Sequence, residues 1–126
     1  MNVPSPYTLP EISFIGGSTQ EFIFHAYDES KEAFSLTSCT ANLAIINYVN
    51  KGGEPLISKD MSITADDESA SDVVYNVLKV TLLPSETVDL CGKYIYQITI
   101  KDVEDNTEPK QGIMYIGNNI NKGYVT

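Results

Sequence analysis

Residues 93–101 read Lys-Tyr-Ile-Tyr-Gln-Ile-Thr-Ile-Lys, and this stretch decides the fold class of the chain. Tyrosine or isoleucine occupies every second position from Tyr94 to Ile100. Successive side chains of an extended strand point to opposite faces, so this alternation predicts a β-strand that buries one face. It is the clearest period of two in the 126 residues.

Six other segments have strand-like patterns that end at turn signals. Residues 20–27 are rich in aromatic side chains and place Phe22 and Phe24 on one face, opposite Ile23 and His25. Residues 40–49 are apolar on both faces, which predicts a central strand covered on both sides. The seven predicted strands are residues 11–15, 20–27, 40–49, 56–64, 73–83, 93–101 and 111–117.

The segment 73–83 is ambiguous, because its valines and leucines suit a helical stripe as well as a strand face. The β-branched residues and Pro84 favour the strand. A helical turn over residues 71–76 remains the alternative.

Polar and small residues separate the strands. Residues 50–55, which contain Gly52 and Gly53, predict the tip of a hairpin between the third and fourth strands. Residues 65–72 are acidic and predict a solvated loop, and residues 28–32 and 102–110 predict polar tips.

Residues 82–94 resemble the corner between the fifth and sixth strands of immunoglobulin-like sandwiches. In that corner a leucine fills the core, a glycine lets the chain bend, and a tyrosine leads into the next strand; Leu90, Gly92 and Tyr94 fit these places. The expected fold is therefore all-β, an immunoglobulin-like antiparallel β-sandwich of about seven strands. In that strand order Cys39 and Cys91 lie near opposite ends, which disfavours a disulfide between them and predicts two free thiols.

The charge of the chain excludes some classes of partner. Seventeen acidic residues face eight basic ones, and the formal net charge is −9. Nucleic-acid binding depends on lysine and arginine neutralising phosphates, so nucleic acids and anionic membranes are not expected partners. No apolar stretch approaches the length of a membrane span, and the first residues lack the pattern of a secretion signal. We therefore expect a soluble protein that is made in the cytoplasm.

No pattern in the sequence predicts a catalytic, cofactor-binding or metal-binding residue. His25 is the single histidine, it lies mid-strand, and no Gly-x-Ser-x-Gly motif accompanies it, so an enzyme is not expected. Acidic residues cluster at 28–29, 66–68 and 102–108, but none has the spacing of a calcium loop. Gly16 and Gly17 are not followed by the Lys-Ser/Thr of a phosphate-binding loop.

Tyrosine is the one aromatic surplus, with eight tyrosines and no tryptophan. Exposed tyrosines favour protein contacts, because a rigid amphipathic ring buries a large area at a low entropic cost. Most of them are expected to be half-buried strand residues. The absence of tryptophan counts against a carbohydrate platform, so a glycan is a partner that is not favoured.

Read in order along residues 11–118, the motifs resemble the N-terminal domain of phage baseplate upper proteins. The motifs that carry the resemblance are turn and core signals. They are Ile-Gly-Gly-Ser-Thr at 15–19 before Phe-Ile-Phe at 22–24, Phe-Ser-Leu-Thr-Ser-Cys-Thr-Ala at 34–41, Pro-Leu-Ile-Ser-Lys at 55–59, Leu-Cys-Gly-Lys-Tyr at 90–94 and Tyr-Ile-Gly at 115–117.

This resemblance implies an immunoglobulin-like phage tail module with no catalytic residues. The expected organisation is an extended arm over 1–10, the β-sandwich over 11–118 and a tail over 119–126. The expected function is a structural or assembly protein of a phage or prophage tail, associated with the baseplate. It would be assembled in the bacterial host and would contact copies of itself and other tail proteins. The alternative is a bacterial surface or carbohydrate-binding β-sandwich module.

Overall fold

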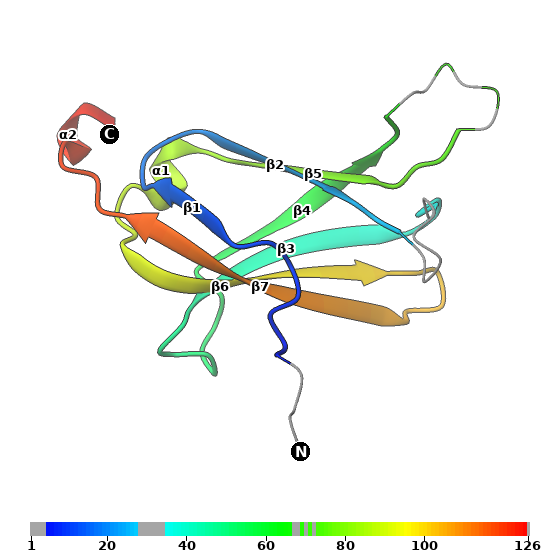
Figure 1. Ribbon diagram of the computed structural model, residues 1–126, viewed down its shortest axis with the longest axis horizontal. Coiled ribbons are helices and arrows are strands. Elements are labelled where there is room, and N and C mark those ends of the chain that lie inside the picture. The colour runs from blue at the N-terminus through cyan, green and yellow to red at the C-terminus, as the bar shows by residue number, and fades with distance from the viewer. Residues whose placement is uncertain (1–4, 28–34, 67–68, 70, 72, 126) are drawn as a thin grey trace.

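The computed structural model describes residues 5–27, 35–66, 69, 71 and 73–125. It contains seven strands and two short helices (Figure 1). In chain order these are β1 (Ile12–Ile15), β2 (Gln20–His25), β3 (Thr40–Asn47), β4 (Ile57–Thr64), β5 (Val77–Leu82), α1 (Pro84–Thr87), β6 (Gly92–Lys101), β7 (Thr107–Gly117) and α2 (Lys122–Val125).

The strands form one curled sheet in the order β1-β7-β6-β3-β4-β5-β2. The curl occurs within β4, whose first half pairs with β3 and whose last three residues pair with β5. One layer therefore contains β1, β7, β6 and β3, and β5 and β2 cover it (Figure 1). This arrangement confirms the predicted all-β, immunoglobulin-like sandwich of seven strands. The sheet was predicted to be antiparallel throughout, and this was wrong for β1, which runs parallel to β7.

The core lies between the layers and consists of alternate residues of each strand. In β6, Tyr94, Tyr96 and Ile98 of the predicted inward face are all at most 4% exposed. Ile95 on the opposite face is equally buried, so burial alternates only from Tyr96 to Thr99. Across the interior, the Phe24 ring of β2 lies 6.0 Å from the Tyr96 ring. Fully burying one large apolar side chain contributes about 1.5–3 kcal/mol, so these facing rows are the main source of stability.

The chain changes layers between β1 and β2 at a turn that needs glycine. Gly17 has a φ of +84°, in the left-handed region that side chains disfavour. Its N–H donates to the Thr87 hydroxyl at 2.9 Å, which ties the turn to α1. The aromatic rings of Phe14 and Phe22, one on each side of the turn, then meet at 5.9 Å between the layers.

The predicted corner after β5 is present. Leu90, predicted to fill the core, is only half-buried and packs against it, while Leu82 is fully buried. Gly92 has a φ of +124°, and the Tyr94 hydroxyl bonds back to the backbone of Cys91. The structure adds the short helix α1, in which the Glu86 carboxylate accepts the N–H of Leu83 at 2.7 Å. This bond satisfies a backbone donor at the start of the helix.

Several predicted boundaries were wrong. The strand predicted over 73–83 begins at Val77, because Tyr75 and Asn76 bond irregularly to Leu36 and Ala26. No helical turn forms at residues 71 and 73–76. The strands predicted over 20–27 and 40–49 end at His25 and Asn47, and the outer face of β3 is only half-buried.

The predicted polar tip at 102–110 is shorter than expected. β7 begins at Thr107, because the turn before it closes within five residues. The Asp102 carboxylate accepts the N–H groups of Glu104 and Asn106 at 2.9 and 3.0 Å, so Lys101 already pairs with Thr107. The tip predicted at 28–32 lies outside the described residues.

Both ends of the domain pack against β7 or the turns beside it. In the predicted arm, the Leu9 N–H donates to the Gln111 carbonyl, and Tyr7 forms a parallel bridge to the same residue. The predicted tail contains α2, which lies at the far end of β7 (Figure 1). Both cysteines are free, as predicted. Within the described part of the chain, no helix is long and apolar enough to cross a bilayer.

Candidate functional site

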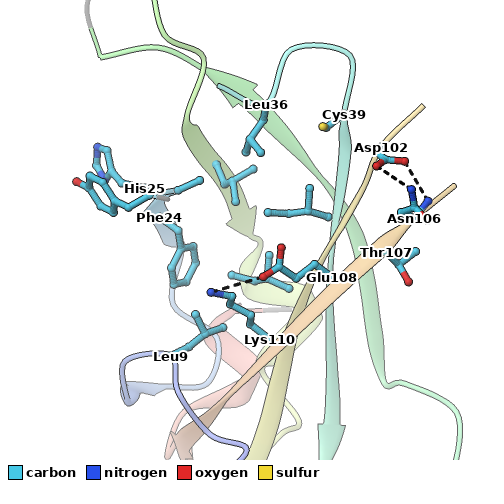
Figure 2. A pocket seen from close by; sticks show the side chains of 15 residues that line it. Leu9, Phe24, His25, Leu36, Cys39, Asp102, Asn106, Thr107, Glu108 and Lys110 are labelled. Atoms are coloured by element: carbon cyan, nitrogen blue, oxygen red, sulfur yellow. Dashed lines mark hydrogen bonds and ion pairs between the residues drawn. The ribbon is translucent and has the colours of Figure 1, made fainter. Parts of the chain in front are cut away.

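An open groove of about 640 Å³ lies at one end of the sandwich, between β2 and the first residues of β7 (Figure 2). Its walls come from the N-terminal arm, β2, β5, β6, β7 and the turns beside them. The lining residues are Leu9, Phe24, His25, Ala26, Tyr27, Leu36, Cys39, Leu78, Ile98, Ile100, Asp102, Asn106, Thr107, Glu108 and Lys110.

The floor of the groove is apolar. Leu36 and Ile98 belong to the buried core, and Phe24, Ile100 and Leu9 pack against it while remaining partly open to the groove. Figure 2 shows Phe24 extending from β2 towards the strands on the opposite side. The core is therefore accessible at this end of the sandwich, and its exposed part can bury apolar atoms of a ligand.

The row of inward-facing residues on β7 explains why the sandwich opens here. Met114 and Ile116 are buried, and the next residues towards the start of the strand on the same face are Gly112, Lys110 and Glu108. The last two are exposed, and Glu108 lies opposite Ile100 in the pairing with β6. The inward face of β7 thus changes from apolar to charged where β1 no longer pairs with it.

Two strand edges border the groove. Among the described residues, β2 pairs only with β5, and residues 107–110 of β7, which precede the position where the arm packs, pair only with β6. Edge strands have backbone N–H and C=O groups that can pair with another chain. An extended segment in the groove could therefore use backbone hydrogen bonds as well as apolar contacts.

The polar groups at the rim are held mainly by one another. Lys110 and Glu108 form an ion pair at 3.9 Å. Asp102 caps the turn, and the N–H of Asn106 is the main reason that the pKa of Asp102 lies below its ordinary value. These contacts fix the shape of the rim. Its carboxylate and ammonium groups can still attract ligand groups of the opposite charge.

The structure places His25 at the rim, half-exposed as the sequence predicted. Its Nε2 lies 3.1 Å from both carboxylate oxygens of Asp66, and its ring stacks on Tyr27 with 6.3 Å between the centroids. The Asp66 carboxylate is 70% exposed. This pair orients the imidazole towards the solvent side of the groove.

The acidic residues of the predicted clusters that the structure describes do not converge, and residues 28–29 and 67–68 lie outside the described part. Asp66 lies beside β2, and Asp102 and Glu108 lie on the β6–β7 hairpin. Within the residues that the structure describes, no three histidine, cysteine, aspartate or glutamate side chains are grouped as metal ligands.

The tyrosines divide into three groups. Tyr94 and Tyr96 are buried, whereas Tyr27, Tyr75, Tyr115 and Tyr124 are exposed. Tyr7 and Tyr48 lie half-buried, with their rings 6.2 Å apart. Lys51 and Lys93 approach the Tyr48 ring to 4.1 and 3.9 Å, which forms a small cationic and aromatic cluster away from the groove.

Sequence reasoning missed the groove itself. It assigned residues 102–110 to a polar tip, so Glu108 and Lys110 were not placed on a strand edge. A signal was present, because Glu108 and Lys110 continue the alternation of Gly112, Met114 and Ile116. Leu36, which closes the top of the groove, lies in a loop where no periodic pattern marks it.

Comparisons with known proteins leave the family open. No family model and no curated protein matches the chain. A candidate glycoside hydrolase from Bacteroides vulgatus is similar in structure, with a TM-score of 0.43 and 10% identity. The match covers 85% of this chain, which spans only 17% of that protein.

AggA, the major subunit of aggregative adherence fimbriae type I from Escherichia coli, is similar in structure, with a TM-score of 0.32 and 11% identity. The match covers 88% of this chain and 91% of the AggA chain. Both TM-scores are below 0.5, so neither protein carries an argument about function. The resemblance to phage baseplate domains stays a prediction.

Proposed function

We propose that the protein is a non-enzymatic structural or assembly protein of a phage or prophage tail, associated with the baseplate, that acts through protein–protein contacts. The observation that carries the proposal is the apolar groove between two strand edges that have no partner strand within the described part of the chain. The motifs along residues 11–118 resemble a phage baseplate domain, and this resemblance is the reason for proposing a phage tail. The protein would be assembled in the bacterial host and would reside in the virion.

The groove suits a segment of protein chain. Free strand edges supply backbone hydrogen bonds, and an apolar floor beside them accepts alternate side chains of an added segment. Phe24, Ile98 and Ile100 provide that floor. Such contacts need no reactive group, and the rim residues His25, Glu108 and Lys110 already have protein partners.

The proposed partners are copies of this chain and other tail proteins. The net charge of −9 argues against a nucleic acid or an anionic membrane as the partner. In a large assembly, the acidic surface would keep free copies soluble before they are incorporated.

The test uses particles induced from the bacterium that carries the gene. We expect an antibody against the protein to label the tail in electron micrographs. In a strain that lacks the gene, complementation with Glu108→Trp, which places a large ring over the groove, should leave the tails unlabelled. Val103→Trp is the matched control, because Val103 is exposed in the turn between β6 and β7 and does not line the groove.

Purified tails that contain none of the wild-type protein would contradict the proposal. Equal labelling with both tryptophan variants would instead remove the groove from it. A clear hit on a glycan array, lost in Glu108→Trp, would favour the alternative of a carbohydrate-binding module.

A further inference from the structure

We infer that the groove receives Ile120 and Tyr124 from the C-terminal segment of a second copy, so that copies join head to tail. The C-terminal segment is residues 118–125, which follow β7. This inference rests on the proposed function, because it names the occupant of the same groove.

The C-terminal segment is held in place but has two uncovered apolar side chains. The Asn119 side chain donates to the Gly16 carbonyl at 2.7 Å and accepts the N–H of Asn121 at 2.7 Å. Ile120 is 97% exposed and Tyr124 is 88% exposed. Ile120 lies in the turn before α2 and Tyr124 lies within α2, so one short segment presents two separate apolar side chains to solvent.

The segment cannot reach the groove of its own molecule. The groove lies beside Glu108 and Lys110, and the segment begins after Gly117, at the other end of the same strand. At about 3.3 Å per strand residue, the seven steps from Lys110 to Gly117 span about 23 Å. Asn119 is bonded to the turn at Gly16, which keeps the segment at its end of the molecule (Figure 1). A second molecule must therefore supply the occupant.

Charge is complementary between the two surfaces. Lys122 is the single charged side chain within residues 118–125. The β6–β7 turn and the rim carry the carboxylates of Asp102, Glu104, Asp105 and Glu108, against the ammonium groups of Lys101 and Lys110. An incoming segment with one positive charge between two apolar side chains matches an apolar groove with an acidic rim.

The contact joins two different surfaces, one at each end of the domain. Such a contact leaves one surface free on each terminal copy, so it generates rings or open chains instead of closed dimers. That geometry is consistent with a module that repeats in a larger structure.

The first test is sedimentation of the full-length chain over a range of concentrations up to about 1 mM. The wild type should show a mass that increases with concentration. Ile120→Asp combined with Tyr124→Asp should weaken association by about tenfold or more, and Lys122→Glu by a smaller factor. Val49→Asp is the matched control, because Val49 is 90% exposed on the β3–β4 hairpin and should change nothing.

The second test uses Cys39, which lines the groove. In a Cys91→Ser background, Tyr124→Cys should form a disulfide with Cys39 of another copy under mild oxidation, giving a ladder of covalent multimers. Peptide mass spectrometry should identify the introduced thiol joined to Cys39. Val49→Cys in the same background should give no such ladder.

A wild type that stays monomeric throughout, or that associates equally well after the two aspartate substitutions, overturns the inference. If tails nevertheless contain the protein and lose it with Glu108→Trp, the proposed function stands and the groove holds a different tail protein. If tails lack the protein, the proposed function fails whatever the sedimentation shows.

Discussion

Gly112 of β7 lies directly opposite Tyr96 of β6, and the tyrosine ring fills the space where a side chain at position 112 would begin. A Cβ atom at 112 would lie 2.6 Å from Cε1 of the ring. The Tyr96 hydroxyl donates to the carbonyl of Pro10. The missing side chain therefore lets the ring cross β7 and hold the N-terminal arm, which forms one wall of the groove.

Gly112→Ala should lower the free energy of unfolding by about 2–3 kcal/mol, because the buried ring has no space into which it can move. Urea denaturation measures the effect. Gly52→Ala is the control, since a Cβ atom there meets nothing within 4 Å. Equal stability of the two variants would contradict the close approach at Tyr96.

Tyr96 should make stability depend on alkaline pH. Burial raises the pKa of Tyr96 to about 12, above the ordinary value of 10.0. Because the folded pKa is the higher one, the stabilisation is complete below pH 10 and is lost as the pH rises from 10 to about 12. The wild type should lose about 2–3 kcal/mol more than Tyr96→Phe over this range. Parallel curves for the two proteins would refute the prediction.

The same variant tests the arm at neutral pH. Tyr96→Phe leaves the Pro10 carbonyl without its donor, which should cost about 1 kcal/mol. Hydrogen exchange at the Leu9 N–H, which bonds to Gln111, should become faster. The Leu43 N–H in the centre of the sheet serves as the internal reference.

Glu86 should stabilise the corner after β5 above acidic pH. Partial burial raises the pKa of Glu86, but hydrogen bonds from the Leu83 N–H and the Lys59 ammonium outweigh it, and the pKa lies below the ordinary 4.5. The stabilisation is thus present above pH 4.5 and is lost as the pH falls through the lower folded value. Glu86→Gln should lose about 1 kcal/mol at pH 7 and depend less on acid.

Thermal unfolding between pH 7 and about pH 3 measures this dependence. Glu54→Gln, at an exposed glutamate on the β3–β4 hairpin, is the control and should unfold like the wild type. If the acid dependence of Glu86→Gln equals that of the wild type, the ion pair with Lys59 does not contribute.

Asp102→Ala should loosen the turn that brings β7 to the groove. The variant removes the acceptor for the N–H groups of Glu104 and Asn106, so both should exchange faster with solvent. Asp89→Ala, at an exposed aspartate outside this turn, is the control. Unchanged protection at Asn106 would show that other bonds close the turn.

The regular strands were predictable because one face of each is buried. Residues 93–101 and the hairpin of the third and fourth strands match β6, β3 and β4 to within one or two residues. Burial of alternate side chains on one face leaves that alternation visible in the sequence. The first residues of β5 and β7 were not predictable from local patterns. The start of β5 depends on the hydrogen bond of Asn76 to the Ala26 carbonyl, and the start of β7 depends on the hydrogen bond of Asp102 to the Asn106 N–H.

Alternation of apolar residues, the glycine turns and the charge by themselves determined an all-β sandwich with an acidic surface. Only the tertiary structure decided that β1 pairs in parallel with the end of β7. It also decided that, among the described residues, the start of β7 pairs only with β6, and that Phe24 and Ile100 line one groove there. Local patterns record which face of a strand is buried. Which edges stay unpaired depends on how the whole sheet curls, and no short stretch of sequence records that.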